Sequence, residues 1–289
     1  MSSTTQFFRL QVRELRRETP DTVSISLEVP ENERHTFRFK QGQHLTLKTE
    51  IAGETLRRSY SICTGVHEND LRVAIKKVDG GVFSTWANEQ LKEGDWLEVM
   101  PPQGRFYTEL SPQNNKLYVA FAAGSGITPV MSILRSTLEL EPKSRFVLFF
   151  GNRSFDYIIF REQLEYLKNR YPDRFSLHHV LSRESLGSDL FKGRIDADKC
   201  RRFAQYFFNP AEVDAYFLCG PEEMVFAVKD TLTDIGANPQ HIHFELFTTT
   251  GIPKKAASSP RETLEAAVTV IQDGAQFDFA LPSDGSTLL

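Results

Sequence analysis

Cysteine is scarce in this sequence, and its scarcity excludes two classes of protein. Three cysteines occur among the 289 residues, at Cys63, Cys200 and Cys219. They lie too far apart for the spacing of a metal site or for the disulfide framework of a small secreted domain. A chain with so few cysteines and neither pattern is typical of the reducing cytosol.

Long apolar runs and a strong charge of one sign are missing as well. The longest apolar runs, such as 146–150, are too short to span a bilayer, and the polar residues 1–6 lack the apolar stretch of a signal peptide. The 34 basic and 38 acidic residues leave a formal net charge of -4, which predicts no general attraction to nucleic acid. We therefore expect a cytoplasmic protein that binds neither membrane nor nucleic acid.

The chain is long enough for two domains of different character. Up to about residue 110, short segments such as Val23-Ser24-Ile25-Ser26-Leu27 alternate apolar with polar residues, and glycines separate them. Such alternation is typical of half-buried strands. With one short helical stretch from Phe83 to Leu91, it predicts a small antiparallel barrel.

The pattern changes after the turn-rich segment Ser111 to Asn115. Apolar strands now alternate with helical segments, which predicts βαβ units and a parallel sheet. One of these helices begins at Pro129, a residue that is favoured at the first helical position. We predict strands at 116–122, 145–150, 175–181, 213–219 and 241–247, and helices at 129–140, 161–171, 197–208 and 222–235.

A third piece follows the parallel sheet. Residues 248–262 contain two prolines and small polar residues, which is typical of a linker. The apolar runs Ala267 to Ile271 and Phe277 to Leu281 then flank Asp273-Gly274, which predicts a β-hairpin. A lone hairpin is only marginally stable in water, so we expect this segment to need a partner or further sequence.

The first motif with chemical content is Arg58-Ser59-Tyr60-Ser61, at the end of a predicted strand. Alternate residues of a strand share a face, so the arginine and the tyrosine lie on one side and the two serines on the other. The motif offers a cation for phosphate, an aromatic ring and two hydroxyls, which are groups that a flavin nucleotide requires. An ordinary polar strand end has the same composition, so the tetrapeptide alone leaves both interpretations open.

A second motif, Gly80-Gly81, precedes a helix that begins with Val82-Phe83-Ser84. Glycines let the backbone approach a ligand closely, and free N–H groups at a helix start favour phosphate oxygens. We expect a phosphate loop here; a plain glycine turn capped by Ser84 is the alternative. Val73 and Lys76, on the strand before it, are further candidates for contact with a ribityl chain or an adenine.

The third motif is Gly124-Ser125-Gly126-Ile127-Thr128-Pro129, between an apolar strand and a helix. That context suits a phosphate-binding glycine loop, although the third glycine of the dinucleotide fingerprint is missing. Glycine turns are also common in α/β proteins that bind no nucleotide. The full string is more specific than its two glycines alone.

Later strands of the predicted parallel sheet end in polar residues, where ligands of such sheets bind. Ser182-Arg183 suits the 2′-phosphate of NADPH, although the neighbouring Glu184 would suit the ribose of NADH. Asn152-Arg153 is a candidate for the adenosine end, or a solvated loop. Cys219-Gly220-Pro221 ends a further strand, where a buried cysteine commonly acts as a small hydrophobic residue.

In this order, the motifs resemble the ferredoxin–NADP reductase family. The resemblance implies an FAD-binding barrel of six antiparallel strands over residues 1–110 and a parallel-sheet NAD(P)-binding domain over residues 111–250. It implies that FAD and NADPH carry the hydride chemistry while the protein sets distance and orientation, so we propose no general base. In the terminal strand, His243 to Phe247, it places an acidic residue and an aromatic residue near the flavin.

The same resemblance assigns roles residue by residue. Those implied at the FAD are Arg58, Ser59, Tyr60, Ser61, Val73, Lys76, Gly81, Val82, Phe83, Ser84, Thr128 and Phe247. Those implied at the NADPH are Gly124, Ser125, Gly126, Thr128, Asn152, Arg153, Ser182, Arg183, Cys219, Gly220 and Pro221. The residues implied at the point of hydride transfer are Ser61, Cys219 and Glu245.

The tail extends the resemblance. After a linker over residues 251–265, residues 266–289 resemble the opening hairpin of a plant-type [2Fe-2S] ferredoxin domain. Such a domain binds its cluster through four cysteines, which this chain lacks, so we expect a shortened domain and no metal site here. The order of flavin, nucleotide and ferredoxin domains is similar to that of the reductase subunits of the phenylacetyl-CoA epoxidase family.

This resemblance implies a reductase that passes electrons from NADPH through FAD to an iron–sulfur domain and on to a diiron oxygenase. The acceptor partner would be an oxygenase component or a ferredoxin. One alternative is a stand-alone reductase of ferredoxin, flavodoxin or free flavin. Another is a regulatory module that binds flavin and nucleotide without turnover.

Overall fold

The computed structural model describes residues 6–185, 187–247, 265–272 and 275–282. Two compact units divide the chain, residues 1–249 and 250–289. The first unit holds a six-stranded sheet and a five-stranded sheet, and the second holds a two-stranded sheet. In the described ranges, no helix combines the length and apolar character that crossing a bilayer would need.

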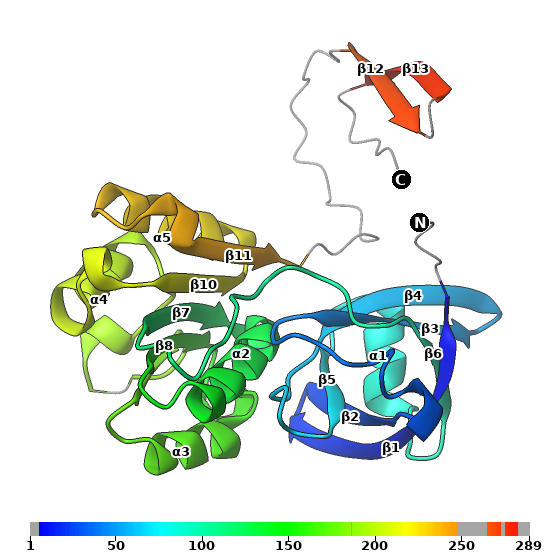
Figure 1. Cartoon of the computed structure of the whole chain (residues 1–289), viewed down its shortest axis with the longest axis horizontal. Helices are drawn as coiled ribbons and strands as arrows, with labels where there is room; N and C mark the ends of the chain where they lie inside the picture. Colours follow the sequence, from blue (N-terminus) through cyan, green and yellow to red (C-terminus); the bar gives the residue numbers. More distant parts are fainter. Residues whose placement is uncertain (1–5, 186, 248–264, 273–274, 283–289) are drawn as a thin grey trace. The chain divides into compact units, whose positions relative to one another are not determined.

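The six-stranded sheet is antiparallel and forms the predicted barrel, in the order β4-β3-β6-β1-β2-β5 (Figure 1). Val23, Ile25 and Leu27 alternate into its core and are at most 2% exposed, as the sequence pattern predicts. Helix α1 (Val82–Glu89) adds Phe83 to the same core. The strands are β1 (Phe8–Thr19), β2 (Thr22–Glu28), β3 (His44–Ile51), β4 (Glu54–Ser61), β5 (Leu71–Lys76) and β6 (Trp96–Val99).

A tight hairpin sets the register of β3 against β4. Ala52 and Gly53 form its two-residue turn, with φ angles of 52° and 81°, which is the combination that a type I′ turn requires. Pairing from Ile51 and Glu54 onward then runs in steps of one residue along both strands. At the far end it places His44 directly opposite Ser61.

The five-stranded sheet is the predicted parallel sheet, in the order β11-β10-β7-β8-β9. Helices α2 and α3 cover one face, and α4 and α5 cover the other (Figure 1). Its strands are β7 (Leu117–Ala123), β8 (Arg145–Asn152), β9 (Phe175–Leu181), β10 (Ala215–Gly220) and β11 (Ile242–Leu246). Its helices are α2 (Ile127–Leu140), α3 (Arg161–Arg170), α4 (Ala197–Phe207) and α5 (Glu222–Asp234).

One expectation about α2 was wrong. The helix begins at Ile127, after a 3-10 turn over Gly124–Gly126, so Pro129 is its third residue rather than its first. The position is still compatible with proline, because the first turn of a helix leaves its N–H groups without intrahelical partners. The glycine loop therefore runs directly into the helix.

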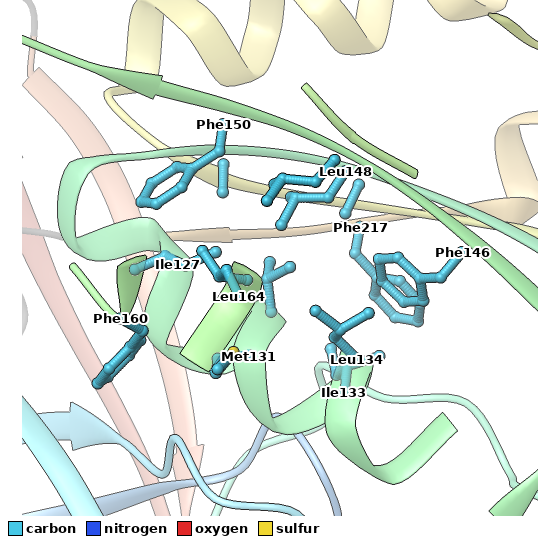
Figure 2. Packing of buried hydrophobic residues seen from close by; sticks show 14 of the residues in the cluster. Ile127, Met131, Ile133, Leu134, Phe146, Leu148, Phe150, Phe160, Leu164 and Phe217 are labelled. Atoms are coloured by element: carbon cyan, nitrogen blue, oxygen red, sulfur yellow. The ribbon is translucent and has the colours of Figure 1, made fainter. Parts of the chain in front are cut away.

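Strand residues alternate between two apolar cores, one on each face of the sheet. On β8, Phe146, Leu148 and Phe150 join the core that α2 covers; Figure 2 shows Phe150 near Ile127, and Phe146 near Leu134. The intervening residues of β8 join the core on the opposite face. Burial of both faces explains why these strands are continuous apolar runs in the sequence.

Residues 111–115, between the two sheets, are attached to the parallel sheet by Glu141, whose side chain is fully buried. Its carboxylate accepts hydrogen bonds from the backbone N–H of Ser111, at 3.1 Å, and from the side-chain amide of Asn114. The hydroxyl of Tyr118 also donates to it, at 2.9 Å. Phe106, ahead of this segment, packs edge-on against Phe217 of β10.

The second unit contains the predicted hairpin. Strands β12 (Glu265–Gln272) and β13 (Ala275–Pro282) pair antiparallel, with Val268 opposite Phe279. The predicted linker over 251–265 falls almost wholly outside the described residues.

Candidate functional site

Three of the predicted residues, from three elements, meet where the barrel adjoins the parallel sheet. Ser61 ends β4, Cys219 lies near the end of β10, and Glu245 is the register partner of Cys219 on β11. The hydroxyl of Ser61 donates to Glu245 Oε2 at 3.5 Å across the two sheets. The structure therefore brings together the serine, the thiol and the carboxyl group that the sequence predicts at one point.

Burial controls the protonation of these groups. It raises the pKa of Glu245 to about 7, and the hydrogen bond from Ser61 opposes the shift. Cys219 is fully buried, which raises the pKa of its thiol well above the ordinary value, and the nearby Glu245 adds to the effect. The thiol thus stays neutral at physiological pH, while the carboxyl group can hold or release a proton there.

His44 is a member of this group that the sequence interpretation missed. Its Nδ1 lies 3.9 Å from Glu245 Oε1, and its side chain is 26% exposed. Burial lowers the pKa of His44, so the imidazole is mainly neutral near pH 7. Recognising the two-residue turn at Ala52-Gly53 would have revealed this residue, because counting pairs outward from that turn reaches His44 opposite Ser61.

The glycine loop, residues 124–126, lies against the same place where the barrel meets the parallel sheet, which we call the corner. A Cβ atom on Gly126 would lie 2.0 Å from the carbonyl oxygen of Cys219, so only glycine fits between the loop and the end of β10. Gly124 has a φ of +54°, which favours glycine for conformational reasons. The Thr128 hydroxyl is buried and donates to the backbone oxygen of Ser125 at 3.0 Å, which stabilises the loop.

Lys76 is close to this loop, although the sequence suggests it only for the flavin side. An added Cβ on Gly124 would lie 3.8 Å from Lys76 Nζ. The ammonium group is also 3.7 Å from Asp21, whose carboxylate accepts a hydrogen bond from Arg153 at 2.8 Å. Burial lowers the pKa of Lys76, and Asp21 opposes that change. A barrel residue thus adds positive charge beside the nucleotide loop.

The turns after β8 and β9 are tied together by backbone hydrogen bonds. Ser182 N donates to Asn152 O at 3.0 Å, and Arg183 N donates to Arg153 O at 2.8 Å. Ser182 and Arg183 are exposed. Glu184, the acidic neighbour that would suit the ribose of NADH, accepts a hydrogen bond from the backbone N–H of Phe155 at 2.9 Å.

The side chain of Asn152 has an unsatisfied donor. The residue is 9% exposed, and its Nδ2 atom has no hydrogen-bond partner among the residues that the structure describes. Buried amide donors are rarely left without an acceptor. The donor is covered by surrounding atoms, so it marks an unsatisfied polar group at the end of β8.

On the barrel side, the residues of the predicted flavin motif lie at the end of β4. Arg58 and Ser59 are exposed, and the Ser59 hydroxyl lies 3.1 Å from that of Thr46 on β3. The ring of Tyr60 packs at a tilt against Phe83 of α1, with centroids 5.6 Å apart. Burial raises the pKa of Tyr60, which keeps its hydroxyl protonated. The strand therefore offers a fixed aromatic surface beside an exposed guanidinium group.

The second glycine motif caps α1. Gly81 precedes the first helical residue, and the Ser84 hydroxyl accepts a hydrogen bond from Val78 N at 3.0 Å. Gly80 has a φ of +70°, and a Cβ added there would meet nothing within 4 Å. Space therefore remains beside Gly80, whereas a Cβ on Gly81 would lie 2.6 Å from the Ser84 hydroxyl, which holds the turn.

The remaining predicted residues differ in what their side chains can reach. Val73 is 0% exposed in the barrel core and is paired with Ile25 and Ile62, so the structure does not open it to a ligand. Val82 is 55% exposed and Phe247, just after β11, is 42% exposed. Pro221 is exposed at the start of α5, and Gly220 is half-buried. These donors, rings and glycines fit a flavin nucleotide beside a nicotinamide nucleotide.

Comparison with known protein families agrees with this geometry. Residues 9–107 match the family described as the oxidoreductase FAD-binding domain, and residues 121–230 match the oxidoreductase NAD-binding domain. The chain is 40% identical over 285 residues to a subunit of the 1,2-phenylacetyl-CoA epoxidase of Escherichia coli, a match that covers 99% of this chain and 80% of that protein. This chain belongs to the ferredoxin–NADP reductase family. The reductase therefore carries an FAD-binding barrel and an NAD-binding sheet.

Two further comparisons place the reductase within the family. It is 33% identical over 274 residues to the ferredoxin reductase component of 3-ketosteroid-9-alpha-monooxygenase from Rhodococcus rhodochrous, covering 92% of this chain and 74% of that one. A ferredoxin NADP+ reductase from Neisseria gonorrhoeae with bound FAD and NADP superposes with a TM-score of 0.70 at 22% identity. That match covers 84% of this chain and 99% of the other and shows the shared fold. The reductase is thus an oxidoreductase whose relatives include the reductase components of oxygenases.

Proposed function

We propose that this reductase takes hydride from NADPH and delivers electrons, through FAD and an iron–sulfur domain, to a diiron oxygenase of the phenylacetyl-CoA epoxidase type. The observation that carries the proposal is the extent of the match to the Escherichia coli epoxidase protein, 99% of this chain. A flavohemoprotein of Pseudomonas aeruginosa matches over 83%. The longer match includes the segment with the β12–β13 hairpin, which we propose to be the start of a ferredoxin domain.

In this proposal, each side of the corner holds one cofactor. Arg58 and the N–H groups at the start of α1 bind the FAD pyrophosphate, and Tyr60 packs on the flavin ring. The loop Gly124–Gly126 receives the pyrophosphate of NADPH, with Lys76 adding positive charge. FAD, when bound, accepts a hydride and gives up electrons singly, which is the chemistry that the side chains do not supply.

The side chains at the corner orient the cofactors and handle a proton. Cys219 is neutral and buried, so it shapes the nicotinamide site and is not a nucleophile. Glu245, with a pKa of about 7, accepts the Ser61 hydrogen bond and can hold a proton at Oε1 or Oε2 near neutral pH. Ser182 and Arg183 meet the 2′-phosphate of NADPH, and Asn152-Arg153 lies at the adenosine end.

The nucleotide preference rests on the exposed side chain of Arg183 beside Ser182. A guanidinium group makes strong contacts with phosphate oxygens, which favours the 2′-phosphate of NADPH at this strand end. Glu184 accepts the Phe155 N–H through one oxygen, but a carboxylate can accept several hydrogen bonds, so this contact does not decide between the nucleotides.

An anaerobic titration tests the function. The FAD-loaded protein is mixed with NADPH or NADH, and bleaching of the flavin absorbance is followed. Rapid bleaching that is faster with NADPH supports the reductase proposal. Absence of bleaching with both nucleotides, in protein that retains FAD, would favour the regulatory alternative. Adding a purified [2Fe-2S] ferredoxin, or free flavin, to the reduced protein then separates the two classes of acceptor.

A further inference from the structure

Helix α2 connects the glycine loop, residues 124–126, to the barrel through a row of polar side chains. Ile127 and Met131 belong to the apolar core beneath the sheet (Figure 2). Thr128, Ser132 and Ser136 recur at every fourth residue and therefore lie along one side of the helix. These three residues are 2%, 0% and 0% exposed, so their hydroxyls are buried rather than solvated.

Two of these hydroxyls bind the backbone of a barrel loop. Ser132 Oγ donates to the carbonyl oxygen of Thr64 at 2.7 Å, and the backbone N–H of Val66 donates to Ser136 Oγ at 3.0 Å. Ser136 Oγ in turn donates to Ser132 O at 2.7 Å, which fixes its orientation. Buried backbone groups need such partners, so the loop has a defined position against the helix.

An ion pair, in which one guanidinium nitrogen lies near both carboxylate oxygens, adds to the same contact. Arg135 Nη1 lies 2.7 Å and 2.9 Å from the two carboxylate oxygens of Glu68. The loop backbone packs closely on α2 beside this ion pair, since a Cβ added to Gly65 would lie 3.2 Å from Arg135 Cβ. The loop and the helix therefore meet through hydrogen bonds, charge and van der Waals contact together.

The barrel loop directly follows the strand with the flavin motif and is hydrogen-bonded to β5 and the residue before it. Thr64 follows Ser61 by three residues. Cys63 N donates to Arg72 O of β5 at 2.9 Å, and the Thr64 hydroxyl donates to Asp70 O at 2.6 Å. The loop cannot shift along α2 without moving the end of β4.

We propose that Ser132, Arg135 and Ser136 are positioning residues that set the separation between the flavin ring and the nicotinamide. The inference rests on the proposed function. Thr128 and Ser132 are four residues apart, a rise of about 6 Å along the helix, so one rigid helix spans from the glycine loop to the barrel contact. A misplacement of about 1 Å at a reacting centre can cost ~100-fold in rate. The three residues act through Thr64, Val66 and Glu68, not by contact with the reacting atoms.

The test compares Ser136→Ala with a matched control on the same helix. Thr137→Val removes a hydroxyl that is equally buried but has no hydrogen-bond partner among the described residues. Arg135→Gln is the second variant, because it weakens the partly exposed ion pair without opening the core. Hydrogen exchange at the Val66 amide is measured in protein without FAD. The hydride-transfer rate constant and the Kd for NADPH are measured in FAD-loaded protein.

We expect Ser136→Ala to speed exchange at the Val66 amide and to slow hydride transfer by roughly 10- to 100-fold, with the Kd for NADPH and the FAD content unchanged. Arg135→Gln slows it less, and Thr137→Val matches the wild type. Wild-type rates in both Ser136→Ala and Arg135→Gln would overturn the positioning role, as would an equal loss in Thr137→Val. If Ser136→Ala does not fold, Arg135→Gln decides alone. Wild-type protein that NADPH fails to reduce would instead overturn the proposed function.

Discussion

The barrel and the parallel sheet hold their functional groups in different ways. In the parallel sheet, the central strand β7 is a continuous apolar run, and its functional residues begin only in the glycine loop that follows it. In the barrel, the polar residues belong to the strand itself, with Arg58 and Ser59 exposed on β4 and Ser61 buried at its end. A functional residue in a turn can therefore be recognised from the local sequence. The neighbours of a functional residue in a strand depend on the pairing register, which the local sequence does not show.

A substitution in the turn after β7 should have the largest effect and tests whether that turn depends on its local residues. Gly126→Ala should lower the free energy of unfolding by about 3 kcal/mol or more, because the new Cβ would lie 2.0 Å from Cys219 O. Gly124→Ala is the matched control, since its Cβ meets no atom closer than 3.8 Å and only its φ of +54° is unfavourable. We expect about 1 kcal/mol for that variant. Equal losses in chemical denaturation would contradict the close approach at Gly126.

A second variant, Glu245→Gln, tests the buried carboxyl group where both sheets meet. The folded pKa of Glu245, about 7, is raised above the ordinary 4.5. The buried carboxyl is therefore tolerated while protonated, and its contribution to stability falls as the pH rises from about 4.5 through 7. Glu245→Gln should match the wild type at pH 4.5 and be more stable at pH 8, by at most about 3 kcal/mol. Urea unfolding at both pH values measures this, and a pH-independent difference would refute it.

A third variant tests the exposed turn after β9. Arg183→Ala should weaken NADPH binding by about 1–3 kcal/mol and leave NADH binding nearly unchanged, because a charged hydrogen bond to the 2′-phosphate is lost. Titration of the FAD-loaded protein with each nucleotide measures the effect. Arg201→Ala on α4 is the control for the loss of one exposed positive charge. Equal losses for both nucleotides would remove the 2′-phosphate role from Arg183.

The smallest expected effect concerns the barrel strand. Tyr60→Ala removes the ring that packs on Phe83 and should lower FAD affinity by about 1 kcal/mol. Tyr60→Phe keeps that ring and should retain most of the affinity. Equilibrium dialysis of FAD with each variant separates the ring from the hydroxyl. Wild-type affinity in Tyr60→Ala would place Tyr60 outside the flavin site.

Much of the fold could be predicted from sequence because the burial of a strand determines the spacing of its apolar residues. The parallel strands are nearly continuous apolar runs, and β2 alternates in steps of two, so their type and order follow from the pattern. The start of α2 was misjudged by two residues, since proline is tolerated throughout a first turn. The predicted boundaries of the domains and the nature of the tail stay predictions.

The site could be predicted only where its residues sit in short motifs. Ser61 and Cys219 belong to such motifs, and Glu245 to a strand that resembles the family's last one. His44 belongs to no motif, and its place depends on a hairpin register. The sequence suggests Lys76 only for the flavin side, because its proximity to Gly124 arises from packing between the barrel and the parallel sheet. Local patterns do not encode contacts of that kind.

Phe106 and Glu141 have a consequence for recombining this protein with its relatives. Phe106 lies before the turn-rich segment, yet it packs on Phe217 of the parallel sheet, and Glu141 binds Ser111 and Asn114 within that segment. The unit that can be exchanged as a nucleotide domain therefore begins near Gly104, ahead of the point where the sequence changes character. A crossover placed at residues 111–115 would separate Phe106 from Phe217 and remove two of the donors to the buried Glu141 carboxylate.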